Sequence, residues 1–256
     1  MCPVAQQYMS DPLVKPLSTR LCSEGLGSWL LAATVVGSGV MAERLSAGNG
    51  GVALLANAGA TVAVLATLIA LLGPVSGAHF NPAVSLVEGL RGRLSWGDVT
   101  GYVLIQVIGC CGGAWLAHAM FELPIFQASA HIRTGPAQWL AEGVATFGLL
   151  LVVLGQRRSE DAPWMVAGWI GAAYWFTAST SFANPAVTIA RSLSDTFSGI
   201  RPMDVPGFIA AQLVGSLLAL GCARILFATA HPLSGADRSA GAGLLEQSPA
   251  DDPSAQ

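Results

Sequence analysis

Two Asn-Pro-Ala tripeptides, at residues 81–83 and 184–186, constrain the fold of this chain more than any other feature. Asn is a preferred N-cap, because its side chain accepts hydrogen bonds from the free N–H groups of a first helical turn. Pro fits the next position, where its missing N–H would have no helical partner. The helices that follow run for only about ten residues between long apolar segments, whereas a bilayer crossing needs roughly 20. The sequence thus predicts two half-helices at membrane depth, one in each half of the chain.

The composition is typical of an integral membrane protein. Of the 256 residues, 53% are hydrophobic and 11% are charged, whereas an ordinary soluble domain has about 25% charged residues. The mean hydropathy is +0.58. The net charge of -3 says little, because acidic residues gather near the C-terminus. No basic cluster indicates a nucleic-acid partner, and the partners expected are the lipid bilayer, water and small neutral solutes.

Six full spans are expected around the half-helices, which makes the fold an all-α membrane protein. The spans are expected at about 24–41, 52–72, 99–120, 137–155, 163–179 and 205–227, and the half-helices at 81–90 and 184–193. Residues 1–23 are expected to form a polar cytoplasmic tail and residues 24–228 the membrane domain. Residues 229–256 have the composition of a disordered cytoplasmic tail.

The two halves of the membrane domain, about 24–121 and about 137–228, repeat each other. Glu24 opens the first span and Glu142 falls in the first turns of the fourth, and Gln106 and Gln212 occupy the spans that follow the half-helices. Each half has three spans, so the second half must enter the membrane from the opposite side. An inverted repeat of this kind predicts a ligand path near the midplane, between the halves.

The distribution of basic residues predicts the orientation. With the N-terminus inside, the inner segments hold Lys15, Arg20, Arg91, Arg93, Arg157, Arg158, Arg224 and Arg238, and the outer ones hold Arg44, Arg133, Arg191 and Arg201. The excess of basic residues on the inner side places both termini in the cytoplasm. The expected location is the inner (plasma) membrane.

The half-helices predict a route for uncharged polar molecules. Their N-termini would meet near the middle of the membrane, and each carries an effective charge of roughly +0.5. A cation meets a positive barrier there, whereas a neutral hydroxyl compound finds amide donors on Asn81 and Asn184. No nucleophile, acid–base pair or metal-ligand cluster is visible in the sequence. We therefore expect a passive channel, with no enzymatic activity, metal or cofactor.

The sequence resembles the aquaporin, or major intrinsic protein, family. Residues 76–84, Ser-Gly-Ala-His-Phe-Asn-Pro-Ala-Val, are similar to the first signature of that family, and the resemblance covers about residues 24–228. It implies a right-handed bundle of six helices with two re-entrant half-helices, and a homotetramer with one pore per subunit. At the pore midplane it implies Asn81, Pro82, Ala83, Asn184, Pro185 and Ala186.

The resemblance also implies an outer constriction formed by four residues. Counted from the motifs, these are Thr61, Ala172 (Gly171 if the register slips by one), Ser181 and Val187. Val187 stands where the family normally has Arg, and Thr61 stands where an aromatic residue is usual. Four small, uncharged side chains predict a ring wide enough for solutes bulkier than water.

Within the family, the chain resembles bacterial members with Val at this position, which are associated with arsenic resistance. The expected solutes are therefore glycerol-like polyols, water and metalloid hydroxides such as arsenite, and methylated arsenicals as well. Arsenite is an uncharged trihydroxide at neutral pH. A general glycerol and water facilitator without a metalloid role is the alternative.

Arg191 lies one helical turn beyond Val187, nearer the outer mouth. One hypothesis is that it forms a cationic vestibule. The alternative is a structural arginine that satisfies loop carbonyls or pairs with Asp195.

Other polar residues near the half-helices have structural and functional interpretations. We expect Glu24 and Glu142 to accept hydrogen bonds from irregular backbone, although ionisable residues inside a membrane are usually functional. If they couple protons to solute movement, the protein is a secondary transporter, which can also be built on an inverted repeat. We expect His79 to order its loop, with a pH gate as the alternative. Cys110 and Cys111 fit helix packing and receive no further role.

Overall fold

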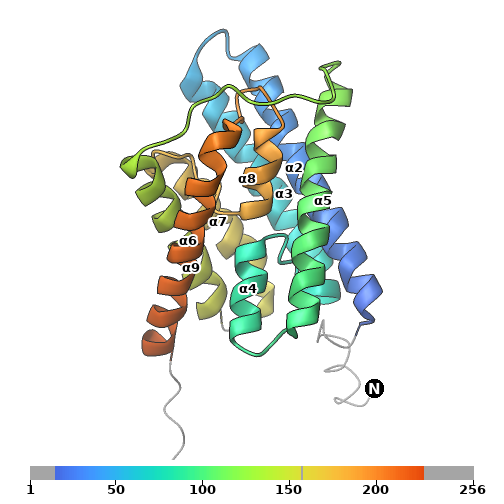
Figure 1. Ribbon diagram of the computed structural model, residues 1–256, viewed down its shortest axis with the longest axis vertical. Helices are drawn as coiled ribbons and strands as arrows, with labels where there is room; N and C mark the ends of the chain where they lie inside the picture. The colour runs from blue at the N-terminus through green and yellow to red at the C-terminus, as the bar shows by residue number, and fades with distance from the viewer. Residues whose placement is uncertain (1–14, 157, 228–256) are drawn as a thin grey trace, which may run out of the picture.

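The computed structural model describes residues 15–156 and 158–227 (Figure 1). In this part the elements are α2 (Leu17–Leu45), α3 (Gly50–Ser76), α4 (Pro82–Leu90), α5 (Trp96–Met120), α6 (Pro136–Gly155), the 3-10 turn η2 (Ser159–Asp161), α7 (Ala162–Phe176), α8 (Pro185–Ser192), the 3-10 turn η3 (Pro202–Asp204) and α9 (Val205–Leu226). Five of the helices are long and apolar enough to cross a membrane, and α7 has 15 residues. The predicted all-α membrane fold is confirmed. The expected tail at 229–256 lies outside the described residues.

The first helix begins earlier than the sequence indicated. α2 starts at Leu17, directly after Pro16, so residues 17–23 are helical rather than part of the polar tail expected at 1–23. Arg20 is buried in the first turn, where its guanidinium pairs with Asp98 of α5 at 2.9 Å. Because the partner lies on another helix, this polar turn can pack against the bundle instead of remaining in solvent.

The two halves of the bundle are built alike. In Figure 1, α4 and α8 lie in the middle with their N-terminal ends toward each other, and the start of α2 and the end of α9 lie at the same end of the molecule. The pairs α2–α5 and α6–α9 cross closely at glycines. A Cβ on Gly109 would lie 2.5 Å from the carbonyl oxygen of Gly25, and one on Gly215 would lie 2.3 Å from that of Gly143. Equivalent crossings in both halves are what an internal repeat requires, since small residues let helix backbones approach each other.

The turns before the half-helices have unusual backbone geometry. Ala78 and Phe80 before α4, and Ser181 and Ala183 before α8, all have φ between 46° and 52°. Residues with a Cβ rarely adopt this left-handed backbone conformation. It costs of order 1–3 kcal/mol per residue and persists only where the surrounding structure holds it. The equivalent positions are strained in both repeats, so the turns are a shared structural device at the centre of the bundle.

Candidate functional site

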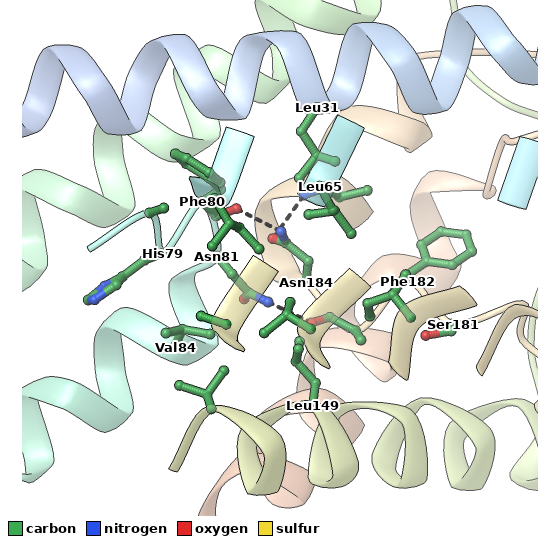
Figure 2. Close-up of a pocket in the computed structure, with 18 of the residues that line it drawn as sticks. Leu31, Leu65, His79, Phe80, Asn81, Val84, Leu149, Ser181, Phe182 and Asn184 are labelled. Carbon is green, nitrogen blue, oxygen red and sulfur yellow. Dashed lines mark hydrogen bonds between the residues drawn. The ribbon is translucent and has the colours of Figure 1, made fainter. Parts of the chain in front are cut away.

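The N-terminal ends of α4 and α8 meet beside a cavity of about 260 Å³ that Asn81 and Asn184 both line. Figure 2 shows each asparagine reaching across to the other repeat: Asn81 Nδ2 donates to the Ala183 carbonyl at 2.8 Å, and Asn184 Nδ2 donates to the Phe80 carbonyl at 2.7 Å. Each amide has two N–H donors. The described residues offer no acceptor for the second one, so each asparagine has an N–H to offer a molecule in the cavity.

The rest of each Asn-Pro-Ala motif supports the cap. Asn81 Oδ1 accepts from Ala83 N at 2.9 Å, and Asn184 Oδ1 accepts from Ala186 N at 3.0 Å. Pro82, Ala83, Pro185 and Ala186 are buried and do not line the cavity. They shape the first turn of each half-helix, and of each motif only the asparagine side chain faces the cavity.

Glu24 and Glu142 hold the strained turns from behind. Both are fully buried, and neither lines the cavity. The Glu24 carboxylate accepts from the backbone N–H groups of His79 at 2.9 Å and Phe80 at 2.7 Å. The Glu142 carboxylate accepts from those of Phe182 at 2.8 Å and of the next residue at 2.9 Å. Charge-assisted bonds of this kind are about twice as strong as neutral ones, which explains how the left-handed turns persist.

Two glutamines complete this arrangement in the same way in each half. Gln106 Nε2 donates to Glu24 Oε2 at 2.8 Å, and Gln212 Nε2 donates to Glu142 Oε2 at 2.7 Å. His79 lines the cavity, with its Nδ1 3.0 Å from Ser85 Oγ and its ring 5.3 Å from that of Tyr102. Both half-helices are thus tied to the long helices around them by buried polar side chains.

We call the α8 end of the cavity the outer half and the α4 end the inner half, following the orientation expected from the basic residues. Glu88, Arg91 and Arg93 line the inner opening, where the Arg91 guanidinium pairs with Glu88 at 2.6 Å. Sequence reasoning did not assign these three residues to the site. Their position seven to twelve residues after Asn81 puts them in the last turn of α4 and just beyond it, which is the signal that could have found them.

In the outer half, Thr61, Ser181 and Val187 line the cavity, but Ala172 does not. Ala172 is exposed on the other side of α7, and a Cβ on Gly171 would lie 2.6 Å from Val62 of α3. A shift of two residues turns a side chain by about 200° around a helix axis, so an error of this size in counting from the motif moves the side chain to the opposite face.

Tyr174 and Ile170 of α7 line the cavity instead. The Tyr174 hydroxyl lies 3.1 Å from Thr61 Oγ1, which also donates to the Asn57 carbonyl at 2.9 Å. A buried tyrosine usually finds a hydrogen-bond partner for its hydroxyl. A lone tyrosine in an otherwise apolar helix was the sequence signal for this position.

Arg191 satisfies a loop carbonyl and also lines the cavity. It is only 2% exposed, its Nε donates to the Ser198 carbonyl, and its guanidinium carbon lies 3.3 Å from the centroid of the Phe182 ring. It does not pair with Asp195, whose Oδ1 accepts from the backbone N–H of Ala130 at 2.9 Å. The outer half therefore has a tyrosine and a positive charge, where the sequence led us to expect a ring of four small, uncharged side chains.

Known proteins resemble this chain in sequence and in fold. Residues 14–162 match the family described as major intrinsic protein. The chain is 55% identical over 219 residues to aquaglyceroporin AqpS of Rhizobium meliloti (strain 1021), across 85% of this chain and 94% of that protein. It is 30% identical over 168 residues to a probable glycerol uptake facilitator protein of Thermotoga maritima, across 60% of this chain and 70% of that protein.

Among solved structures, the aquaglyceroporin from Plasmodium falciparum superposes with a TM-score of 0.64, across 83% of this chain and 97% of that chain. The identity of that pair is 18%, so the likeness is one of fold alone. The family match, the extent of the 55% identical relative and the paired half-helices agree, and this chain belongs to the major intrinsic protein family.

Proposed function

We propose that this protein is a passive channel for water and small uncharged polyols such as glycerol. The observation that carries the proposal is the pair of asparagines, each bound to the opposite repeat by one N–H and offering the other to the cavity. The cavity is lined from Arg93 at the inner opening to Arg191 in the outer half, and so extends past the N-terminal ends of both half-helices. The printed names of two relatives, an aquaglyceroporin and a probable glycerol uptake facilitator, support the same solute class.

The dimensions and chemistry of the cavity favour hydroxylated solutes. A bound water needs about 10–15 Å³ of such space, so a volume of about 260 Å³ accommodates several waters or a short polyol. Tyr174, Thr61 and Arg191 place hydroxyl groups and N–H donors along one part of a wall that is otherwise largely apolar. A polyol presents both an apolar carbon side and a row of hydroxyl groups, and it fits such a lining.

We further propose metalloid hydroxides such as arsenite as solutes, since an uncharged trihydroxide offers the same hydroxyl pattern as glycerol. Val187 and Thr61 support this, because both side chains are small where they face the cavity. Methylated arsenicals fit less well than the sequence suggested, because Tyr174 and Arg191 make the outer half narrower and more polar. A glycerol and water facilitator without a metalloid role is the alternative.

The proposed setting is the inner (plasma) membrane, with both termini cytoplasmic and four copies forming a homotetramer. The start of α2 and the end of α9 lie at the same end of the bundle, which supports one side for both termini (Figure 1). The assembly rests on the family resemblance.

Stopped-flow measurements on proteoliposomes test the function. The wild-type protein should accelerate osmotic shrinkage and then re-swelling in glycerol and in arsenite, relative to protein-free liposomes. Asn184→Asp is the informative variant, because it keeps an oxygen to cap α8 but replaces the amide donor by a second acceptor. We expect it to lose most of the solute flux. Wild-type flux at the protein-free level would overturn the channel, and flux of glycerol without arsenite would select the alternative.

A further inference from the structure

We propose that Arg133, in the connection between α5 and α6, is a positioning residue that sets solute selectivity in the outer half of the cavity by acting through Phe182 and Arg191. The inference rests on the proposed channel function and concerns a residue that does not itself line the cavity. In Figure 1 this connection runs across the end of the bundle, next to α8.

Arg133 joins the loops on both sides of α8. Its Nε donates to the Gly199 carbonyl at 2.8 Å, and its terminal nitrogens donate to the carbonyls of Ser179 and Phe197, both at 3.4 Å. Its backbone N–H donates to Asp204 Oδ2 at 2.9 Å. A guanidinium presents five N–H donors in a rigid, planar fork, whereas a lysine ammonium is a compact point charge. Only the fork can satisfy carbonyls from three separate positions of the loops at once.

The Phe182 ring connects Arg133 with the solute path. The guanidinium carbon of Arg133 lies 5.3 Å from the ring centroid, and that of Arg191 lies 3.3 Å from it. On another side the ring makes an edge contact with Phe208, with 5.1 Å between centroids. Phe182 and Arg191 both line the cavity. A movement of Arg133 would therefore reach a solute through the ring and through the guanidinium stacked on it.

The outer half differs from the inner half in charge. At the inner end, Arg20 lies over the Tyr102 ring and is paired with Asp98 at 2.9 Å. Within residues 15–156 and 158–227, neither Arg133 nor Arg191 forms an ion pair with a carboxylate. Two like charges thus share one aromatic ring, and their repulsion favours separation.

A neighbouring histidine in the same connection responds to this field. Burial, and after it the charges of Arg133 and Arg191, lower the pKa of His131.

The hydrogen bonds from Arg133 to the loop carbonyls oppose the repulsion between the two guanidiniums. They also keep the Phe182 ring in the position where it narrows the cavity beside Arg191. Without them, the loops on both sides of α8 lose their common anchor, so we expect the Phe182 ring to shift and the outer half to widen.

Arg133→Lys keeps the positive charge but removes the planar fork of N–H donors. In proteoliposomes it should raise the ratio of glycerol to water permeability by at least about threefold, the change in a rate that about 0.65 kcal/mol produces. Arg44→Lys is the matched control. Arg44 also lies over a phenylalanine, 5.2 Å from the Phe121 centroid, and donates to a carbonyl at 3.1 Å, but it is exposed and does not line the cavity. The control should leave the ratio unchanged.

A double-mutant cycle with Phe182→Leu tests the route. If Arg133 acts through the ring, Arg133→Lys should have no further effect on the ratio in the Phe182→Leu background, and an effect of full size there would overturn the proposal. An unchanged ratio in Arg133→Lys, with the wild type conducting, would overturn it as well. Should Arg133→Lys fail to fold, Phe182→Leu alone must raise the ratio, or the proposal fails. Absence of wild-type flux would instead indicate failure of the channel function.

Discussion

In the outer half of the cavity, the residue directly after the second Asn-Pro-Ala is a valine, and the positive charge stands one turn farther along α8. Val187 is 5% exposed and faces the cavity, and Arg191 lies beyond it on the Phe182 ring. The first repeat has Val84 at the equivalent place, which also lines the cavity. An apolar contact therefore follows each asparagine, so a polyol can turn its carbon side toward these valines while its hydroxyl groups meet the amides.

Val187→Arg should convert the cavity toward water selectivity. The new guanidinium would fill the space beside the asparagines and stand near the charge of Arg191. We expect glycerol permeability to fall at least about tenfold, equivalent to about 1.4 kcal/mol of added barrier, while water permeability falls much less. Stopped-flow light scattering on proteoliposomes measures both rates, and Val187→Thr, which makes the side chain polar at nearly the volume of valine, is the control for a change of polarity alone. An equal loss for both solutes would mean that the substitution only blocks the cavity.

A pair of substitutions in α7 distinguishes its two faces. Tyr174→Phe removes a hydroxyl that lies 3.1 Å from Thr61 Oγ1 and lines the cavity. The loss of one such polar contact, about 1 kcal/mol, should lower glycerol permeability about fivefold relative to water. Ala172→Leu adds far more volume but on the exposed face of α7, and it should change neither rate. If Ala172→Leu alone reduced glycerol flux, the placement of α7 described above would be wrong.

At the scale of the elements, each half-helix depends on a turn that its own residues do not favour. The left-handed conformations of Phe80 and Ala183 are held by carboxylates from α2 and α6. The reciprocal bonds of Asn81 and Asn184 then fix one turn against the other. The half-helices are consequently positioned by the long helices and by each other, which gives a rigid site built on short elements.

The glycine crossings between the long helices provide a test of how closely these helices pack. Gly215→Ala should lower the thermal unfolding midpoint in detergent, because its Cβ would lie 2.3 Å from the Gly143 carbonyl oxygen and would push α9 away from α6. Overpacking of this kind costs typically about 1–3 kcal/mol. Gly221→Ala in the same helix meets no atom within 4 Å and should leave the midpoint unchanged or raise it slightly. Equal midpoints for the two variants would argue against close packing at Gly215.

The parts of the structure that the sequence predicted well depend on local chemistry or on the repeat. The half-helix starts follow from the capping preference of Asn81 and Asn184, and the inverted repeat follows from motifs in the same order in each half. Two features depend on distant contacts and could not be found in this way. The early start of α2 needs Asp98 to compensate Arg20, 78 residues away along the chain. The cavity-facing residue of α7 depends on how that helix packs against α3, where Gly171 approaches Val62 and the Tyr174 hydroxyl meets Thr61.

At the scale of the whole molecule, the arrangement favours free diffusion over coupled transport. A coupled transporter needs an ionisable group that meets the solute path, but Glu24 and Glu142 are fully buried behind the turns and do not line the cavity. Their oxygens are occupied by backbone and glutamine donors. The ionisable side chains that do line the cavity lie toward its two ends: His79, Glu88, Arg91, Arg93 and Arg191.

Glycerol flux through proteoliposomes should therefore be proportional to the glycerol gradient, equal in both directions and unaffected by an imposed pH gradient. The physical reason is that the two carboxylates that could couple protons to the solute, Glu24 and Glu142, are buried behind the turns and do not meet it. Radiolabelled glycerol uptake with and without a pH difference across the membrane measures this, with the same vesicles made permeable to protons as the control. Accumulation of glycerol above its external concentration, driven by protons and abolished in Glu142→Gln, would identify a secondary transporter on the same fold.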